Sequence, residues 1–415
     1  MRLLSLLALL SISVSLSSCT APQASESPLP SADAETVGMS QERLNLIAPA
    51  MQKFVDEGSV AGIVSLVAKN GHIVHWESVG FSNIADHEPM DDNMIVQICS
   101  MTKPITSTAV MMLVERGVVE LDAPVSTYLP VFSESTVYTE SGPIAVDNPI
   151  TVADLLSHTS GLTYGFFGNT PTDSLYRAAD LASADLEHLV TTIAQIPLVA
   201  HPGQQWTYSF STDVLGYLIE SVTGIPFDEF LQTEILDPLG MVDSSFFVPS
   251  DKRERYATNY SVSEDGSLQE NLGSGCGNHE SRPQLLSGGA GLNSTAADYV
   301  RFTQMLLNGG VLEGTRILQT ETVDLMRTNR LSDNLIADLS YPGYGFGLGF
   351  AVMTDASKTE RKDTNGIFRW TGYSNTGFWV DPENELIGIV LSQLTPSGTS
   401  MRSDFQTLVY EALEN

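Results

Sequence analysis

Ser100 and Lys103 are the residues whose types and spacing most directly suggest chemistry. They form the chain's only Ser-x-x-Lys, in the stretch Cys-Ser-Met-Thr-Lys-Pro over 99–104. Residues three apart on a helix share a face, so the amine can reach the hydroxyl. A serine hydroxyl becomes a nucleophile when a neighbouring base takes its proton, and a desolvated lysine can be that base. The pair therefore predicts an activated serine.

The neighbouring residues predict where this pair sits on its helix. Proline is tolerated in the first helical turn, so Pro104 places Ser100 at or near a helix start. The positive end of the helix dipole would stabilise an oxyanion there. Ala109 and Leu113 continue the helical spacing, and Gly117 is a plausible stop.

The rest of the chain predicts strands at both ends around a mostly helical middle. We expect a helix over 41–57, strands over 62–68 and 72–79 joined by an Asn-Gly turn, a helix after a tyrosine at 208 capped by Ser211 or a neighbour, a polar surface segment over 250–282, a helix ending at 307, strands over 344–353, 367–371, 377–380 and 386–391, and a last helix over 401–413. This order indicates an α+β fold, in which both termini form one antiparallel sheet flanked by helices and a helical domain is inserted.

The first residues read as a targeting segment. A basic start and an apolar run over 3–16, too short for a stable membrane anchor, predict a signal peptide over 1–18. Leu16-Ser-Ser-Cys19 resembles the lipobox of bacterial lipoproteins, which implies a lipid on Cys19. Residues 19–36 are rich in Ser, Ala and Pro, which predicts a flexible tether. Thr20 is not the aspartate of inner-membrane retention, so we expect a lipid-anchored protein of the bacterial envelope, on the outer membrane and facing the periplasm. An ordinary secretory signal is the alternative.

Charge and composition narrow the possible partners. The formal net charge is −30, which argues against nucleic acid and against an anionic membrane surface. His72 and His75 are three apart on an expected strand and point to opposite faces, and no zinc motif occurs. We therefore predict no metal and no cofactor. Membrane contact is expected through the N-terminal lipid only, and the oligomeric state is left open.

The remaining cysteines and one histidine are more ambiguous. A disulfide between Cys99 and Cys276 is permitted outside the cytoplasm, but the position of Cys99 beside Ser100 favours packing in the core. His158 invites a catalytic interpretation, yet no Asp-His spacing supports it. We expect His158 to be structural.

Three separated motifs resemble the serine β-lactamase/penicillin-binding-protein superfamily, and within it the class C-like, family VIII carboxylesterases. Ser100-Met-Thr-Lys103 matches the first motif, Tyr208-Ser-Phe210 stands in place of Tyr-x-Asn, and Trp370-Thr371-Gly372 stands where β-lactamases carry Lys-Thr-Gly. The turns at 158–162 and 288–292 also look like family turns. The resemblance covers 37–412.

The resemblance implies a fold and a set of roles. An α/β domain would comprise 37–98 and 285–415, and a mostly helical domain 99–284, with the site between them. Ser100 would be the acyl-accepting nucleophile, with Lys103 and Tyr208 as the base pair and Tyr208 returning a proton to the leaving alcohol. The backbone N–H groups of Ser100 and Tyr373 would form the oxyanion hole.

Departures from the motifs bear on the substrate. Phe210 replaces an amide and Trp370 a cation, so the substrate-binding group of Phe210, Trp370, Thr371 and Gly372 favours neutral acyl esters over anionic lactams. Gly372 would allow the close backbone approach that a substrate needs. No Gly-x-Ser-x-Gly occurs, which excludes an α/β-hydrolase elbow. We therefore expect a carboxylesterase on small-molecule esters of short to medium acyl chains. A DD-peptidase, β-lactamase or acyltransferase is the alternative, and a non-catalytic binder of cell-wall fragments is a second.

Overall fold

The computed structural model describes residues 27–179, 181, 185–271, 276, 280–337, 341–359 and 362–414. The predicted signal peptide and the lipidation site Cys19 lie outside the described residues. The boundaries of the two predicted domains stay a prediction.

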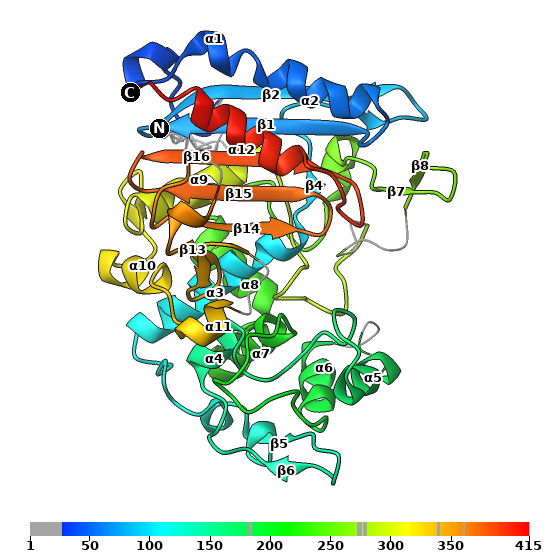
Figure 1. The fold of residues 1–415 in the computed structure, drawn as a ribbon, viewed down its shortest axis with the longest axis vertical. Helices are drawn as coiled ribbons and strands as arrows, with labels where there is room; N and C mark the ends of the chain where they lie inside the picture. The colour runs from blue at the N-terminus through cyan, green and yellow to red at the C-terminus, as the bar shows by residue number, and fades with distance from the viewer. Residues whose placement is uncertain are drawn as a thin grey trace, which may run out of the picture.

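One antiparallel sheet organises the fold, and both ends of the chain contribute to it (Figure 1). Its eight strands run in the order β12-β13-β14-β15-β16-β1-β2-β3. Their bounds are β1 Gly62–Lys69, β2 His72–Asn83, β3 Glu88–Pro89, β12 Tyr344–Phe346, β13 Ala351–Met353, β14 Phe368–Gly372, β15 Thr376–Asp381 and β16 Leu386–Ser392. Because β1 pairs with β16 in the middle of the sheet, the predicted fold class is confirmed.

Turn chemistry sets the hairpins of this sheet. Asn70 and Gly71 both have positive φ, at 51° and 75°, and join β1 to β2 as predicted. The expected single strand over 344–353 is instead the hairpin β12–β13, so that prediction is wrong. Gly349, with φ 108°, and the bond from the Gly347 N–H to the Phe350 carbonyl reverse the chain there.

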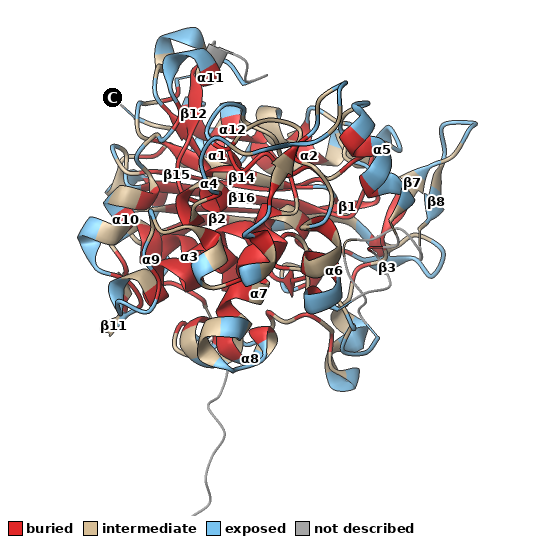
Figure 2. Cartoon of the chain, turned by 90° about the horizontal axis from the view of Figure 1, so that it is seen from below, coloured by how far each residue is buried: buried red, intermediate tan, exposed pale blue. Residues whose placement is uncertain are grey.

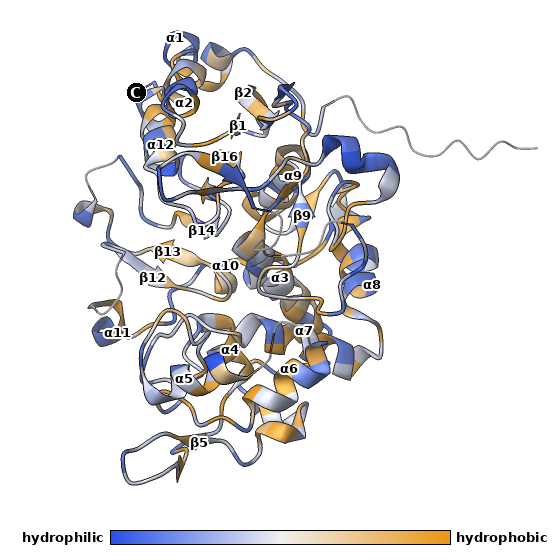
Figure 3. Ribbon diagram, turned by 90° about the vertical axis from the view of Figure 1, so that its right-hand side faces the viewer, coloured by the Kyte–Doolittle hydropathy of each residue, from blue (hydrophilic) through white to orange (hydrophobic). Residues whose placement is uncertain are grey.

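Helices cover both faces of the sheet (Figures 1 and 3). The first face carries α1 (Gln41–Leu44), α2 (Ile47–Asp56) and α12 (Met401–Glu411), and the opposite face carries α9 (Ala296–Leu307). The predicted helix over 41–57 is thus two helices. Pro49 lacks an N–H, and its ring would clash with the carbonyl of residue 45, so one continuous helix cannot form.

The helical region lies beside the sheet and is built around α3 (Thr102–Glu115). Every residue of α3 from 102 to 113 is buried, which is why its first turn can hold groups away from water (Figure 2). Its other helices are α4 Val152–Ser157, α5 Pro171–Ala178, α6 Leu186–Ile193, α7 Ser211–Thr223 and α8 Phe227–Leu231. The Ser211 backbone N–H donates to the Ser209 hydroxyl, so Ser209 satisfies the start of α7.

Short elements connect these parts. Four short strand pairs are β4 Val96–Gln97 with β9 Asn293–Ser294, β5 Thr136–Val137 with β6 Ile144–Ala145, β7 Tyr260–Val262 with β8 Leu268–Glu270, and β10 Val311–Leu312 with β11 Thr315–Arg316. The remaining helices are α10 Thr320–Met326 and α11 Asp333–Ala337, a π-helical segment at Gln232–Leu236, and short 3-10 helices at Ala34–Val37, Cys99–Met101, Val125–Thr127, Pro130–Phe132, Ser250–Arg255 and Ala356–Lys358.

The second half of the predicted tether is packed, so that part of the prediction is wrong. Leu29 and Ala34 are buried, and the backbone of Pro30 and Ala32 exchanges hydrogen bonds with Ile73 on β2. Burial of the apolar side chains and hydrogen bonds to the free backbone groups of a sheet strand order this segment, although its Ser- and Pro-rich composition predicts flexibility. Within the described ranges, no helix combines the length and apolar character needed to cross a bilayer.

Candidate active site

Ser100 lies in the turn Cys99–Met101, directly before α3, as predicted. The Ile98 N–H donates to the Leu292 carbonyl at 3.1 Å, and the Leu292 N–H donates to the Thr102 hydroxyl at 3.1 Å. The Gly-rich segment 288–292 therefore fixes the turn from outside.

Cys99 is bonded to Cys276, so the disulfide that the sequence permits but does not favour is formed. Cys99 is nevertheless fully buried, and its sulfur lies 3.0 Å from the Ser374 hydroxyl. The disulfide thus ties the residue before Ser100 to a segment 177 positions further along the chain.

Gly372 has close neighbours within the protein, and the predicted approach of a substrate stays a prediction. A Cβ at this position would overlap the Ile98 carbonyl and the Thr376 hydroxyl. Glycine is therefore required because β14 packs directly on the turn that carries Ser100, and the close approach is to the protein itself. Tyr373 lies just beyond the end of β14, in the turn that leads to β15, so its expected place on the strand is wrong, and the residue is 46% exposed.

Lys103 is the buried cation of the site, with 1% of its surface exposed. Its Nζ donates to the Ser100 hydroxyl at 3.4 Å, to the Tyr164 hydroxyl at 2.9 Å and to the Gly289 carbonyl at 2.7 Å. Burial lowers the pKa of Lys103 to about 7, and the negative charge of Asp213 opposes that shift. Near neutral pH, Lys103 can therefore exchange a proton with its neighbours.

Tyr208 completes the predicted group. The Trp370 indole N–H donates to its hydroxyl at 3.2 Å, and its ring centroid lies 4.4 Å from Lys103 Nζ. Burial raises the pKa of Tyr208, whereas hydrogen bonds with Ser100 and Trp370 lower it. Ser100, Lys103, Tyr208 and Trp370 thus share one hydrogen-bonded network.

Sequence reasoning missed Tyr164, the second phenol of this network. Tyr164 is two residues beyond the predicted turn at 158–162, which is the signal that could have found it. Its ring packs 4.5 Å from Phe210 and 5.1 Å from Phe166, while Phe166 and Phe167 are each 62% exposed. These four residues form an aromatic cluster around Tyr208.

His158 supports the site from behind. It ends α4 with φ 58°, its Nδ1 lies 3.2 Å from the Ser209 hydroxyl, and its ring packs 4.9 Å from the Tyr208 ring. Burial and the positive charge of Lys103 hold the pKa of His158 well below its usual value. A neutral, packed imidazole fits the structural role expected for it.

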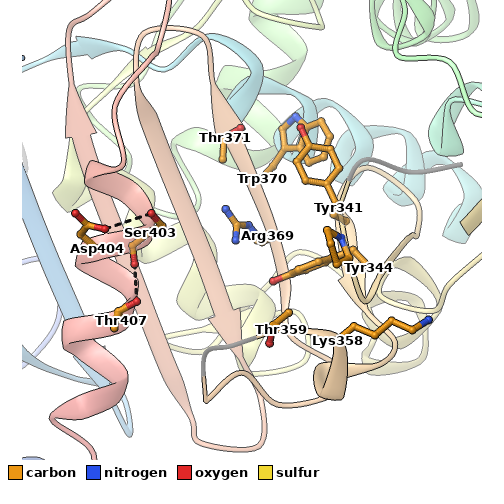
Figure 4. Close-up of a pocket in the computed structure, with 12 residues that line it drawn as sticks. Tyr341, Tyr344, Lys358, Thr359, Arg369, Trp370, Thr371, Ser403, Asp404 and Thr407 are labelled. Carbon is orange, nitrogen blue, oxygen red and sulfur yellow. Dashed lines mark hydrogen bonds between the residues drawn. The ribbon is translucent and has the colours of Figure 1, made fainter. Parts of the chain in front are cut away.

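A cavity of about 510 Å³ lies beside the site, between β12–β14 and α12 (Figure 4). Trp370, Thr371, Arg369, Tyr341 and Tyr344 line it together with residues of α12. Trp370 both lines this cavity and donates to the Tyr208 hydroxyl, while Thr371 lines the cavity beside it. No group of three or more His, Cys, Asp or Glu side chains that could hold a metal occurs among the described residues.

Comparison with known proteins gives a consistent result. A family model described as Beta-lactamase matches residues 47–412. The chain is 33% identical over 360 residues to protein Rv1367c of Mycobacterium tuberculosis, covering 84% of this chain and 89% of that protein. It is 31% identical over 365 residues to esterase EstB of Burkholderia gladioli, covering 83% and 88%. The solved structure of EstCE1, "a hydrolase with promiscuous acyltransferase activity", is 27% identical, with a TM-score of 0.77 over 90% of this chain and 99% of that one.

Proposed function

This chain belongs to the Beta-lactamase family and is a serine hydrolase, and we propose that it is a carboxylesterase for neutral esters with short to medium acyl chains. The observation that carries the proposal is the hydrogen bond from the Trp370 indole to Tyr208. An uncharged donor and an apolar ring stand where the β-lactamase motif has a cation. A carboxylate entering there would lose hydration without gaining an ion pair.

In the proposed mechanism, Ser100 Oγ attacks the ester carbonyl carbon while its proton passes to the Tyr208–Lys103 pair. The positive charge of Lys103 favours the phenolate form of Tyr208, which makes the phenol a usable base. The carbonyl oxygen becomes an oxyanion and accepts hydrogen bonds from the backbone N–H groups of Ser100 and Tyr373.

The intermediate then collapses as the bond to the alcohol oxygen breaks. That oxygen takes the proton from the Tyr208 hydroxyl and leaves, and the acyl group stays on Ser100. Water attacks the acyl-enzyme by the same route, giving the acid and restoring Ser100.

The aromatic cluster supports an apolar acyl group. Phe166 and Phe167 expose their rings beside Tyr208, and Phe210 packs against Tyr164. An acyl chain gains roughly 0.8 kcal/mol for each CH₂ that it buries against such surfaces. Transfer to an alcohol in place of water is the second candidate activity, supported by the similarity to EstCE1.

We also propose that the protein is lipid-anchored through Cys19 in the bacterial cell envelope. The Cys99–Cys276 disulfide supports this placement because disulfides persist in oxidising compartments. The high negative charge supports the lipid, rather than the protein surface, as the membrane contact.

The test compares kcat/KM for p-nitrophenyl butyrate, ampicillin and a D-Ala-D-Ala peptide. We expect the ester to be turned over fastest, and Trp370→Lys to shift the ratio toward the two carboxylate-bearing substrates. Trp370→Phe is the matched control, because it removes the N–H donor without adding charge. A fluorophosphonate should label wild type but not Ser100→Ala. A faster lactam or peptide would refute the esterase assignment, and labelling of Ser100→Ala would refute the nucleophile.

A further inference from the structure

Asp213 is a buried carboxylate whose charge acts on Lys103. It lies in the first turn of α7 and is 1% exposed. Its Oδ1 accepts hydrogen bonds from the Ser287 hydroxyl at 2.5 Å and from the Gly289 N–H at 3.2 Å. Burial raises the pKa of Asp213, whereas the positive charge of Lys103 and these two donors act in the opposite direction and favour the ionised form. Among the described residues, no donor reaches the second oxygen, Oδ2.

One peptide segment links this carboxylate to Lys103. The Gly289 N–H donates to Asp213, and the Gly289 carbonyl accepts from Lys103 Nζ at 2.7 Å. A Cβ at position 289 would lie 2.6 Å from Asp213 Oδ2 and 2.8 Å from the Tyr164 hydroxyl. Glycine is therefore needed there so that the segment can pass between Asp213, Tyr164 and Lys103.

The groups facing Lys103 differ in charge. Tyr164 and Tyr208 face it from two loops, and His158 faces it from the end of α4. Asp213 on α7 is the carboxylate in this set. A buried carboxylate oxygen without a donor is costly unless a nearby positive charge compensates it. Lys103 is the cation placed to do so.

We propose that Asp213 is a positioning residue that holds Lys103 in its ammonium form beside Ser100 and Tyr208, acting across the Gly289 peptide. This inference rests on the roles proposed above for Ser100, Lys103 and Tyr208. In the desolvated site, Lys103 would otherwise release its proton more readily. A neutral lysine would not favour the phenolate form of Tyr208, and the base would be lost. The raising effect of Asp213 on the pKa of Lys103 is consistent with this role.

The test is the pH profile of kcat/KM for p-nitrophenyl butyrate in Asp213→Asn, which keeps the shape and removes the charge. An opposite charge nearby shifts a pKa by roughly one to three units, so we expect the alkaline decline of activity to move about one pH unit lower. At pH values above the decline, kcat/KM should be about tenfold lower than in wild type. At pH values below it, kcat/KM should change little. Ser287→Ala removes one donor to the carboxylate but keeps its charge, so it should leave the alkaline decline close to that of wild type.

Asp298→Asn is the matched control. Asp298 is also buried and accepts from a serine hydroxyl, that of Ser244, and from a backbone N–H, that of Asp243. An Asp213→Asn profile that superimposes on wild type, or an equal shift in Asp298→Asn, would overturn the inference. Fluorophosphonate labelling of wild type distinguishes this outcome from failure of the proposed function, in which Ser100 would not be labelled at all.

Discussion

Replacing Lys103 by methionine should stabilise the fold near neutral pH while removing activity. Burial lowers the pKa of Lys103 from 10.5 to about 7. Because the folded pKa is the lower one, the unfolded chain binds more protons between these values, and this group makes stability rise with pH across that window. Below pH 7 the lysine is charged in both states, and the folded protein bears the full cost of burying the charge.

The size of the effect follows from the pKa values. One pKa unit corresponds to about 1.4 kcal/mol, so the cost is on the order of 4 to 5 kcal/mol at pH 6.5 and falls to about 1 to 2 kcal/mol at pH 9.5. Methionine also leaves the Gly289 carbonyl without its donor, which costs about 1–3 kcal/mol at either pH. Lys103→Met should therefore be about 2 kcal/mol more stable than wild type at pH 6.5 and no more stable at pH 9.5.

Urea unfolding at the two pH values measures both differences. The hydrogen-bond penalty cancels between them, so the advantage of Lys103→Met should shrink by about 3 kcal/mol as the pH rises. The same comparison between Lys103→Met and its parent in the Asp213→Asn background shows the effect of Lys103 without any change in the protonation of Asp213. If the variant differs from wild type by the same amount at both pH values, the lysine is not charged at a cost in the folded protein and the reasoning is refuted.

Three further predictions concern the nucleophile, the anchor and the disulfide. Ser100→Ala and Lys103→Ala should each remove nearly all ester hydrolysis, and the double variant should be hardly worse than either, measured as kcat/KM. Cys19→Ser should move the protein from the membrane fraction to the soluble fraction on centrifugation; a wild type already soluble would exclude the anchor. Cys276→Ser should lower the free energy of unfolding by up to about 5 kcal/mol, because the bond closes a loop of 177 positions; a reductant should lower wild type to the same level and leave the variant unchanged.

Much of the sheet could be predicted because its signals are local. The Asn70-Gly71 turn needs two residues with positive φ, and the sequence supplies them. The hairpin over 344–353 was missed because its apolar run continues through the glycines at 347 and 349, so hydropathy alone reads one strand. The packing of the segment around Leu29 is not predicted for the opposite reason: its composition is that of a linker, and the partner of Pro30 and Ala32, Ile73 on β2, is distant in sequence.

The residues of the site also differ in whether a local sequence signal predicts them. Ser100, Lys103 and Trp370 stand in short motifs whose spacing carries their chemistry. Asp213 and Tyr164 stand in no chemical spacing of their own. They meet Lys103 because the turn after α4, the start of α7 and the segment 288–292 converge in three dimensions. The pairing of Cys99 with Cys276 depends on that convergence too, since no spacing specifies which cysteines meet.

Trp370 stands where the β-lactamase motif has a cation, and this replacement and the burial of Asp213 both affect the charge around Tyr208 and Lys103. A lysine at position 370 would place a second positive charge near the Tyr208 hydroxyl, where the indole N–H now donates. Without it, Lys103 is the cation that contacts both Ser100 and Tyr208 among the described residues. Burial keeps water away from Lys103, so in the role proposed above its charge depends on the carboxylate of Asp213. With the roles proposed above, a site that lacks this second cation depends on the charge of Lys103 alone, and therefore on the buried counter-charge at Asp213.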